Sequence, residues 1–432
     1  MTNTVTGLRV SNSVFATATR RFRLALVALL LVTTFVTTCF AGPIGVYLAL
    51  TAALASLFFA FDRAYLAAAL QDWGVRGFLL SFFVLWASFL PSATDVDDVM
   101  GFVDFLAFPV MVPAFALLAR HAGKRSIEIV AGLACLGALA ALATGIYEVR
   151  ILGAPRAAGG TSPIFFSGMA ILLSFFSLLG LLSSTSRWRW ILLIGNAAGV
   201  GAAVLGGTRG AMLGYLAFLL AFGVYTLLWW QRPMLIRLLT VAAIAVTSVG
   251  FSAALFDTTR ITTLATIVTE AATQGGVTDQ SINQRFTIYN AAIQSIMESP
   301  LYGHGWWHRF EAAVPYMGKL GLDTIAHDNH AHLHNDILNF GSAGGIIAIV
   351  AYLILMASPL VSTFRSPRTA SWGLRVTAAS GLVMAYMIMG AVDVMFVFEI
   401  PKSMFVLCSA VLMAFFLDAP PNNPESASHP VT

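Results

Sequence analysis

The sequence predicts an all-α, polytopic integral membrane protein with about twelve transmembrane helices and one large exterior loop. Of its 432 residues, 58% are hydrophobic and only 10% are charged, whereas a soluble domain carries about 25% charged residues. The apolar residues also fall into separate blocks of about 20 residues, the length at which a helix crosses a hydrocarbon core of roughly 30 Å. Composition and block length together exclude an ordinary soluble domain.

The first apolar block covers residues 24–41 and follows three arginines, Arg20, Arg21 and Arg23. A basic segment before an apolar one resembles a secretory signal peptide. The apolar run is longer than the usual signal-peptide core of about 7–15 residues. We therefore interpret it as an uncleaved first transmembrane helix.

Apolar runs and helix-breaking residues together divide the rest of the chain into predicted spans. The full set of predicted spans covers 24–41, 43–61, 74–91, 99–119, 126–147, 163–183, 190–207, 210–230, 234–256, 341–363, 373–392 and 400–417.

These spans define the predicted organisation of the chain. Residues 1–256 contain the first nine spans, which are joined by short loops, and residues 341–418 contain the last three. Residues 257–340 form the large loop between the two groups. Residues 419–432 are rich in Pro, Asn and Ser, and we expect a disordered cytoplasmic tail there.

The placement of basic residues predicts the orientation in the membrane. With the N-terminus in the cytoplasm, the inner segments collect most of the Lys and Arg residues, as cytoplasmic loops usually do. This arrangement puts both termini in the cytoplasm and the loop 257–340 outside it.

Two short helices are predicted inside the loop. Residues 258–273 carry Ile261, Leu264 and Val268 on one face at helical spacing. A second helix begins at Ser281, where S-I-N-Q fits the capping-box pattern.

The cysteines and the net charge exclude several functional classes. Cys39, Cys135 and Cys408 are widely spaced within apolar segments, so neither a disulfide framework nor a zinc motif is implied. The formal charge of +4 is small, and no basic run is interleaved with aromatics. We therefore expect no nucleic-acid partner.

Most of the histidines lie in the large loop. An imidazole there can act as a general acid or base, can bind zinc or copper, or can be a polar surface residue without a role. The spacing matches no H-E-x-x-H motif, so we expect no metal. The histidines in question are His304, His308, His327, His330, His332 and His334.

Three arginines on the predicted exterior side form a second group: Arg156, Arg209 and Arg285. A guanidinium offers a rigid fork of donors that suits phosphate oxygens. The alternative is that each side chain only extends to the membrane interface. Together with the histidines, these arginines indicate a site for a phosphorylated lipid beside a proton-transfer residue.

Four stretches of the chain resemble motifs of the O-antigen ligase family and of its relatives, the bacterial O-antigen polymerases and O-linked oligosaccharyltransferases. The resemblance covers roughly residues 156–360. The stretches are R-A-A-G-G-T-S-P at 156–163, G-G-T-R-G-A at 206–211, R-F-T-I-Y-N-A-A-I-Q-S-I-M-E-S-P-L-Y-G-H-G at 285–305 and H-L-H-N-D-I-L-N-F-G-S-A-G-G-I at 332–346. The family often has an acidic residue after H-N-x-x-L, where this chain reads Asn339-Phe340.

The resemblance implies a GT-C-like architecture and an inverting, metal-independent glycosyltransferase without a cofactor. By position, Arg209 and Arg285 would hold a pyrophosphate, with Arg156 as a helper. His334 would be the general base that deprotonates the acceptor hydroxyl. The residues predicted to orient the base or support the site are His332, Asp336, Asp328 and Tyr289.

The resemblance also implies the partners and the location. The donor would be an undecaprenyl-pyrophosphate-linked O-antigen, and the acceptor would be a lipid A-core oligosaccharide. Membrane lipids would surround the protein. The protein would be a multi-pass protein of the Gram-negative inner membrane, with its active site in the periplasm.

Several alternatives remain open from the sequence. A polymerase would use the same donor with a lipid-linked glycan as acceptor, but polymerases often have two sizeable exterior loops, whereas residues 148–163 form a short one. Protein-directed transferases tend to be longer. A transporter would show internal repeats, and none is visible. A metal-dependent membrane enzyme using the histidines is the last alternative.

Overall fold

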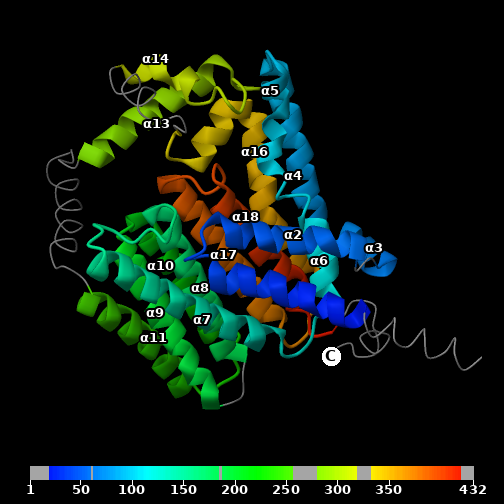
Figure 1. Cartoon of the computed structure of the whole chain (residues 1–432), viewed down its shortest axis with the longest axis vertical. Coiled ribbons are helices and arrows are strands. Elements are labelled where there is room, and N and C mark those ends of the chain that lie inside the picture. The colour runs from blue at the N-terminus through cyan, green and yellow to red at the C-terminus, as the bar shows by residue number, and fades with distance from the viewer. Residues whose placement is uncertain (1–18, 60–61, 184–186, 256–279, 319–331, 420–432) are drawn as a thin grey trace, which may run out of the picture.

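The computed structural model describes residues 19–59, 62–183, 187–255, 280–318 and 332–419, and the statements below concern these residues. Within them every regular element is helical and no strand occurs (Figure 1). The predicted all-α class is therefore confirmed. The predicted helix 258–273 and the predicted tail 419–432 fall outside these ranges, apart from residue 419.

The helices follow one another with short connections over the first part of the chain. A helix that starts at residue 19 ends in a π-helical turn at Thr33–Thr37. The helices after it are α2 (Pro43–Phe59), α3 (Arg63–Gln71), α4 (Trp73–Phe89), α5 (Val96–Val99), α6 (Met111–Ala119), α7 (Ser126–Ile146), α8 (Pro163–Ser183), α9 (Leu192–Gly206), α10 (Arg209–Leu228) and α11 (Met234–Leu255). Those after residue 279 are α13 (Gln280–Glu298), α14 (Val314–Met317), α16 (Asp336–Arg365), α17 (Trp372–Val392) and α18 (Glu399–Ala410).

Seven of the helices in the described ranges are long and apolar enough to cross a membrane. Each coincides with one of the predicted spans. Two shorter apolar helices, Pro43–Phe58 and Met234–Ser248, lie on two further predicted spans. The seven spans are Trp73–Ser92, Ser126–Ile151, Pro163–Ser183, Arg189–Gly206, Arg209–Leu228, Asp336–Arg365 and Trp372–Val392.

The predicted span 99–119 is wrong as a single helix. It is divided into a 3-10 helix at Met100–Phe105 and the separate helix α6, which begins at Met111. Pro109 lies between the two. Proline has no N–H to donate, and the residue before it disfavours the helical conformation. Mean hydropathy does not detect such a break, because the residues directly beside Pro109, 105–108 and 110–112, are all apolar.

Small residues bring the central helices together. Helix α8 has 94% of its span buried inside the protein. On α9, a Cβ at Gly199 would lie 2.5 Å from the carbonyl oxygen of Ala170, and a Cβ at Gly195 would lie 2.8 Å from the Cα of Cys135. Both positions therefore require glycine, because α9 packs against α7 and α8 at backbone distance, as small-residue interfaces in membranes do.

Helices α13 and α14 lie at the top of Figure 1, above the start of α16. They share an apolar cluster that also includes Leu333, just before α16. This cluster attaches α13 and α14 to the segment before α16 independently of the main core. Its buried members are Ile288, Ala291, Ala292, Phe310, Ala313, Met317 and Leu333.

Helix α16 is broken at Gly344 and Gly345, and the segment after α13 fills the break. Gly345 has φ of 61°, and a Cβ there would lie 2.3 Å from the carbonyl carbon of Leu301. At the break, the N–H groups of His304 and Gly305 donate to the carbonyls of Ser342 and Ala343 at 2.9 and 2.8 Å. The P-L-Y-G-H-G and S-A-G-G-I stretches are therefore two halves of one backbone junction.

Candidate functional site

His334 is held at the first turn of α16 by its neighbours. Asn335 caps the helix, since its Oδ1 accepts the N–H of Leu338 at 3.1 Å, and its Nδ2 donates to the carbonyl of Ala391 at 2.9 Å. The hydroxyl of Tyr289 donates to the carbonyl of His334 at 2.9 Å. His334 has φ of 50°, a left-handed conformation that few non-glycine residues adopt. The local fold thus holds the backbone of His334 in place at the start of α16.

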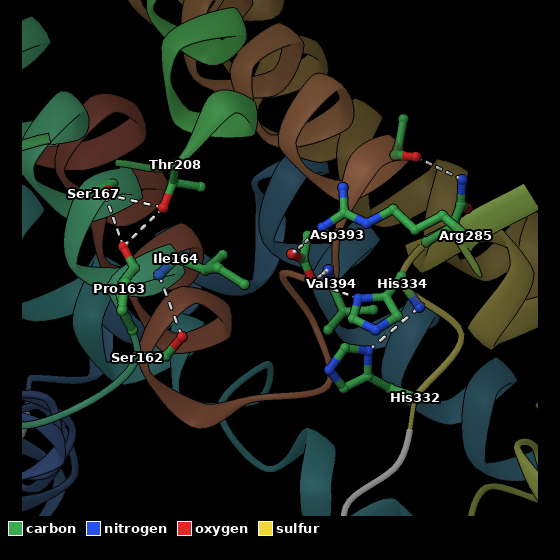
Figure 2. A network of polar contacts seen from close by, with 12 residues as sticks. Ser162, Pro163, Ile164, Ser167, Thr208, Arg285, His332, His334, Asp393 and Val394 are labelled. Atoms are coloured by element: carbon green, nitrogen blue, oxygen red, sulfur yellow. Dashed lines mark hydrogen bonds and ion pairs between the residues drawn. The ribbon is translucent and has the colours of Figure 1, made fainter. Parts of the chain in front are cut away.

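Asp393 lies between His334 and Arg285. Its Oδ1 is 3.4 Å from Nδ1 of His334, and its Oδ2 is 3.4 Å from Nη2 of Arg285 (Figure 2). The carboxylate is 6% exposed, whereas the His334 and Arg285 side chains are about one third exposed at 32% and 34%. Sequence reasoning missed Asp393. The signal available was a single acid in A-V-D-V, at the predicted exterior end of the span 373–392.

The surroundings of Asp393 favour its charged form. Burial raises the pKa of the Asp393 carboxyl, but the hydrogen bond and charge of His334 lower it. The charges of His332 and Arg285 act in the same direction, and the net result is a pKa below the usual value. Asp393 therefore stays ionised at neutral pH, where it can pair with an imidazolium and a guanidinium at once.

Asp393 is expected to add an acid-sensitive contribution to stability. Its pKa is lower in the folded state than its unfolded value of about 3.9, so the contribution is present above about pH 3.9 and is lost as the pH falls through the folded pKa. The thermal unfolding midpoint of the wild type should therefore fall more steeply below about pH 4 than that of Asp393→Asn. The exposed Asp97 provides the control, since Asp97→Asn should follow the wild-type curve. Parallel curves for wild type and Asp393→Asn would contradict this prediction.

The residues predicted to support the base have different positions. The rings of His332 and His334 have centroids 4.2 Å apart, and the His334 N–H donates to Nδ1 of His332 at 3.3 Å. Asp336 does not contact the His334 ring; Asp393 takes the position predicted for it. The cap at Asn335 turns Asp336 into the helix bundle, where it is fully buried. Asp328 lies outside the described residues.

Asp336 instead holds the backbone that follows α17. Its carboxylate accepts the N–H of Met395 at 3.0 Å and that of Phe396 at 3.2 Å. Gly390 makes room for it, since a Cβ at Gly390 would lie 2.3 Å from Oδ2 of Asp336. Asp336 therefore fixes the segment that begins with Asp393.

Asp336→Ala is expected to destabilise the fold by about 2–5 kcal/mol, because two buried N–H groups lose their acceptor. The measurement is the unfolding midpoint of the purified protein in detergent. Asp336→Asn keeps one acceptor oxygen and should lose less than Asp336→Ala. Equal midpoints for wild type and Asp336→Ala would show that these hydrogen bonds do not hold the segment.

A cavity of about 240 Å³ opens beside Asp393, and the three arginines predicted from the sequence all line it. They come from different parts of the chain: Arg156 from the loop before α8, Arg209 from α10 and Arg285 from α13. The other lining residues are Ile164, Gly207, Thr208, Gly210, Ala211, Met389, Val392, Asp393 and Met395.

The G-G-T-R-G stretch places the start of α10 at this cavity. Gly207 ends α9 with φ of 61°, Thr208 is extended, and Arg209 is the first residue of the 20-residue helix α10. The first N–H groups of a helix have no partner within it, and the helix dipole favours an anion there. Arg209, Gly210 and Ala211 all line the cavity. Both the start of α10 and the Arg209 guanidinium therefore favour a negatively charged ligand there.

Arg156 is fixed by hydrogen bonds to the turn between α9 and α10. Its Nε donates to the carbonyl of Gly206 at 2.8 Å, and its Nη2 donates to Oγ1 of Thr208 at 3.0 Å. Thr208 in turn donates to the carbonyl of Pro163 at 3.1 Å and accepts from the Ser167 hydroxyl at 3.2 Å (Figure 2). Arg156 therefore both lines the cavity and braces the start of α10.

The arrangement combines an anion site with a proton acceptor. Three guanidinium groups and a helix start surround the cavity, and Asp393 is the one acid among its lining residues. A ligand with two or more negative charges suits this surface. The imidazole of His334 lies on the other oxygen of Asp393, where the carboxylate can stabilise an imidazolium.

The side chains around Asp393 also form a candidate metal site. One ligand atom each from His332, His334 and Asp393 lie within 4.8 Å of one another. Two imidazoles and a carboxylate are a donor set that zinc accepts. This geometry keeps the metal alternative open.

Comparison with protein-family models matches residues 194–353 to the family described as O-Antigen ligase. No curated protein matches the chain. The matched region includes Arg209, Arg285 and His334, while Arg156 and Asp393 lie outside it. The resemblance seen in the sequence motifs is thereby confirmed.

Proposed function

We propose that this chain is a membrane enzyme that transfers O-antigen glycan from undecaprenyl pyrophosphate to a hydroxyl of lipid A-core oligosaccharide. The match of residues 194–353 to the family described as O-Antigen ligase supports this proposal. Family members are glycosyltransferase-like ligases and polymerases. One observation carries the finer proposal: Arg156, Arg209 and Arg285 converge on one cavity beside the His334–Asp393 pair. The reaction takes place on the periplasmic face of the inner membrane.

The donor pyrophosphate occupies the cavity. As the bond between the anomeric carbon and the phosphate oxygen breaks, its electron pair stays on the pyrophosphate. Arg209 and Arg285 stabilise the growing charge, with the N–H groups at the start of α10. Preformed donors are effective here, because they need no reorganisation during the reaction. Undecaprenyl pyrophosphate is the leaving group.

His334 activates the acceptor. The acceptor oxygen attacks the anomeric carbon from the face opposite to the pyrophosphate, and its proton passes to the imidazole. Asp393 orients the ring through Nδ1 and stabilises the imidazolium that forms. The new bond has the opposite anomeric configuration, and the proton returns to water when the product leaves.

The choice between ligase and polymerase depends on the acceptor, and lipopolysaccharide profiling of a deletion strain tests it. A ligase deletion should produce rough lipopolysaccharide and accumulate polymeric lipid-linked O-antigen. Complementation with the wild-type chain should restore the ladder. A core that carries a single repeat unit in the deletion strain would instead identify the polymerase.

The metal alternative rests on the cluster of His332, His334 and Asp393. The proposed reaction needs no metal, because arginines neutralise the leaving group. Treatment of the purified enzyme with a chelator should leave transfer within about twofold of the untreated rate. Loss of activity, with recovery on adding zinc, would replace the general-base mechanism with a metal-dependent one.

A further inference from the structure

A second basic cavity, separate from the candidate active site, lies between the first helix and the end of α6. Its volume is about 600 Å³. It is lined by Thr19, Arg20, Arg23, Leu24, Arg120 and His121. Four of these six side chains are Arg or His, and none is acidic.

Acidic groups compensate only part of this charge. Asp62, at the start of α3, forms an ion pair with Arg120, and Arg120 also lies over the ring of Tyr65 at 5.5 Å. The Nε of Arg23 is buried and has no hydrogen-bond partner among the described residues. A buried donor without an acceptor is costly. Arg23 therefore calls for an acceptor that the described protein atoms do not supply.

Apolar surface continues directly from the basic cavity. A smaller cavity of about 20 Å³ shares Arg23 and Arg120 with it and is otherwise lined mainly by apolar side chains. On the outside, Phe22 and Phe58 are 44% and 81% exposed. The apolar lining residues include Leu57, Leu66, Ala116 and Leu117. Cationic and apolar surfaces thus meet, as a phospholipid requires.

We propose that this cavity binds the phosphate of an anionic membrane phospholipid, with the acyl chains against the adjoining apolar surface. A volume of about 600 Å³ is larger than one inorganic phosphate needs and accommodates a glycerophosphate headgroup. The guanidinium groups of Arg20 and Arg23 suit phosphate oxygens. By the predicted orientation the cavity faces the cytoplasm, where basic pockets between helices bind anionic headgroups. This proposal is independent of the proposed function.

Native mass spectrometry of the full-length protein in detergent, titrated with phosphatidylglycerol, tests the proposal. Arg20→Gln/Arg23→Gln should bind this lipid about 30-fold more weakly than the wild type. The matched control is Arg21→Gln/Arg125→Gln, which removes the same charge from two exposed positions that do not line the cavity. The control should bind within about threefold of the wild type. The proposal would be overturned if both double variants lost the same affinity for phosphatidylglycerol, or if neither lost any.

A second arm separates the lipid from a soluble anion. Inorganic phosphate at the same concentrations should neither bind in the mass spectra nor displace phosphatidylglycerol; displacement would assign the cavity to a soluble phosphate compound. Both double variants should elute as the wild type does in size exclusion. If the cavity variant fails to fold, each single variant replaces it, and each should bind about fivefold more weakly. Single variants that bind as the wild type does would equally overturn the proposal.

Discussion

His334→Ala is expected to abolish glycan transfer while the protein remains folded and inserted. A positioned general base contributes about 10²–10⁴-fold to a rate, so transfer should fall by at least about 10²-fold. The His334 side chain is 32% exposed, so its removal leaves little buried space. The measurement is the initial rate of transfer from a lipid-linked donor with the purified protein, supported by lipopolysaccharide profiles in cells.

Two further variants separate chemistry from backbone strain. An alanine at φ of 50° is itself unfavourable by about 1–2 kcal/mol, whereas asparagine adopts this conformation readily. His334→Asn should therefore fold like the wild type and still fail to transfer. His308→Ala, which changes a histidine that contacts Asp98 at 3.0 Å, should keep transfer within about threefold of the wild type. Near-normal transfer by His334→Asn would exclude the general-base role.

Arg209→Ala and Arg285→Ala are each expected to lower kcat/KM for the donor by about 10²–10³-fold, the usual effect of removing one donor that stabilises a developing charge. Lysine at either position should recover only part of the lost kcat/KM, because lysine restores the positive charge but not the fork of N–H donors. Arg285→Ala should also lower kcat more than Arg209→Ala does, since Arg285 contacts the carboxylate that orients His334.

A matched arginine outside the cavity controls for net charge. Arg150 is exposed and precedes Arg156 in the same predicted exterior segment, but it does not line the cavity. Arg150→Ala should keep kcat/KM within about threefold of the wild type. The pyrophosphate assignment fails if Arg209→Ala and Arg285→Ala behave like Arg150→Ala, or if lysine restores full activity at both positions.

The arginines of the site were predictable because topology and side-chain chemistry agreed on them. Arg156, Arg209 and Arg285 all fall on one predicted side of the membrane, and all three line one cavity. Asp393 was not predictable in this way. It is 59 residues from His334 in sequence, and a lone acid at the end of a span looks the same whether it caps a helix or orients an imidazole.

Sequence proximity was misleading for Asp336. It lies two positions after His334, so it was a natural candidate to orient the ring. The helix that starts at Asp336 rotates successive side chains by about 100°, and the capped start at Asn335 points Asp336 into the bundle. The direction of a side chain at a helix start depends on the cap and on what packs beside it, here Gly390.

Average hydropathy also misses isolated charges and breaks. Lys402 is fully buried in α18, where its Nζ lies 2.7 Å from Glu399 and 5.3 Å from the Phe105 ring centroid. One lysine hardly changes the mean over a span, so the sequence reading passed over it. The division at Pro109 was missed for the same reason. The apolar composition of the spans was predictable, but the local exceptions at Pro109 and Lys402 were not.

The backbone junction at Gly344 and Gly345 has a consequence for how substrate binding can change the site. Because the segment after α13 is joined there to α16, backbone hydrogen bonds connect the helix that carries Arg285 to the helix that follows His334. In the proposed mechanism, the spacing between the leaving-group contact at Arg285 and the proton acceptor at His334 would then depend on this junction. If the proposed function holds, a change of glycan would be accommodated on other surfaces, while the junction keeps the same reaction geometry.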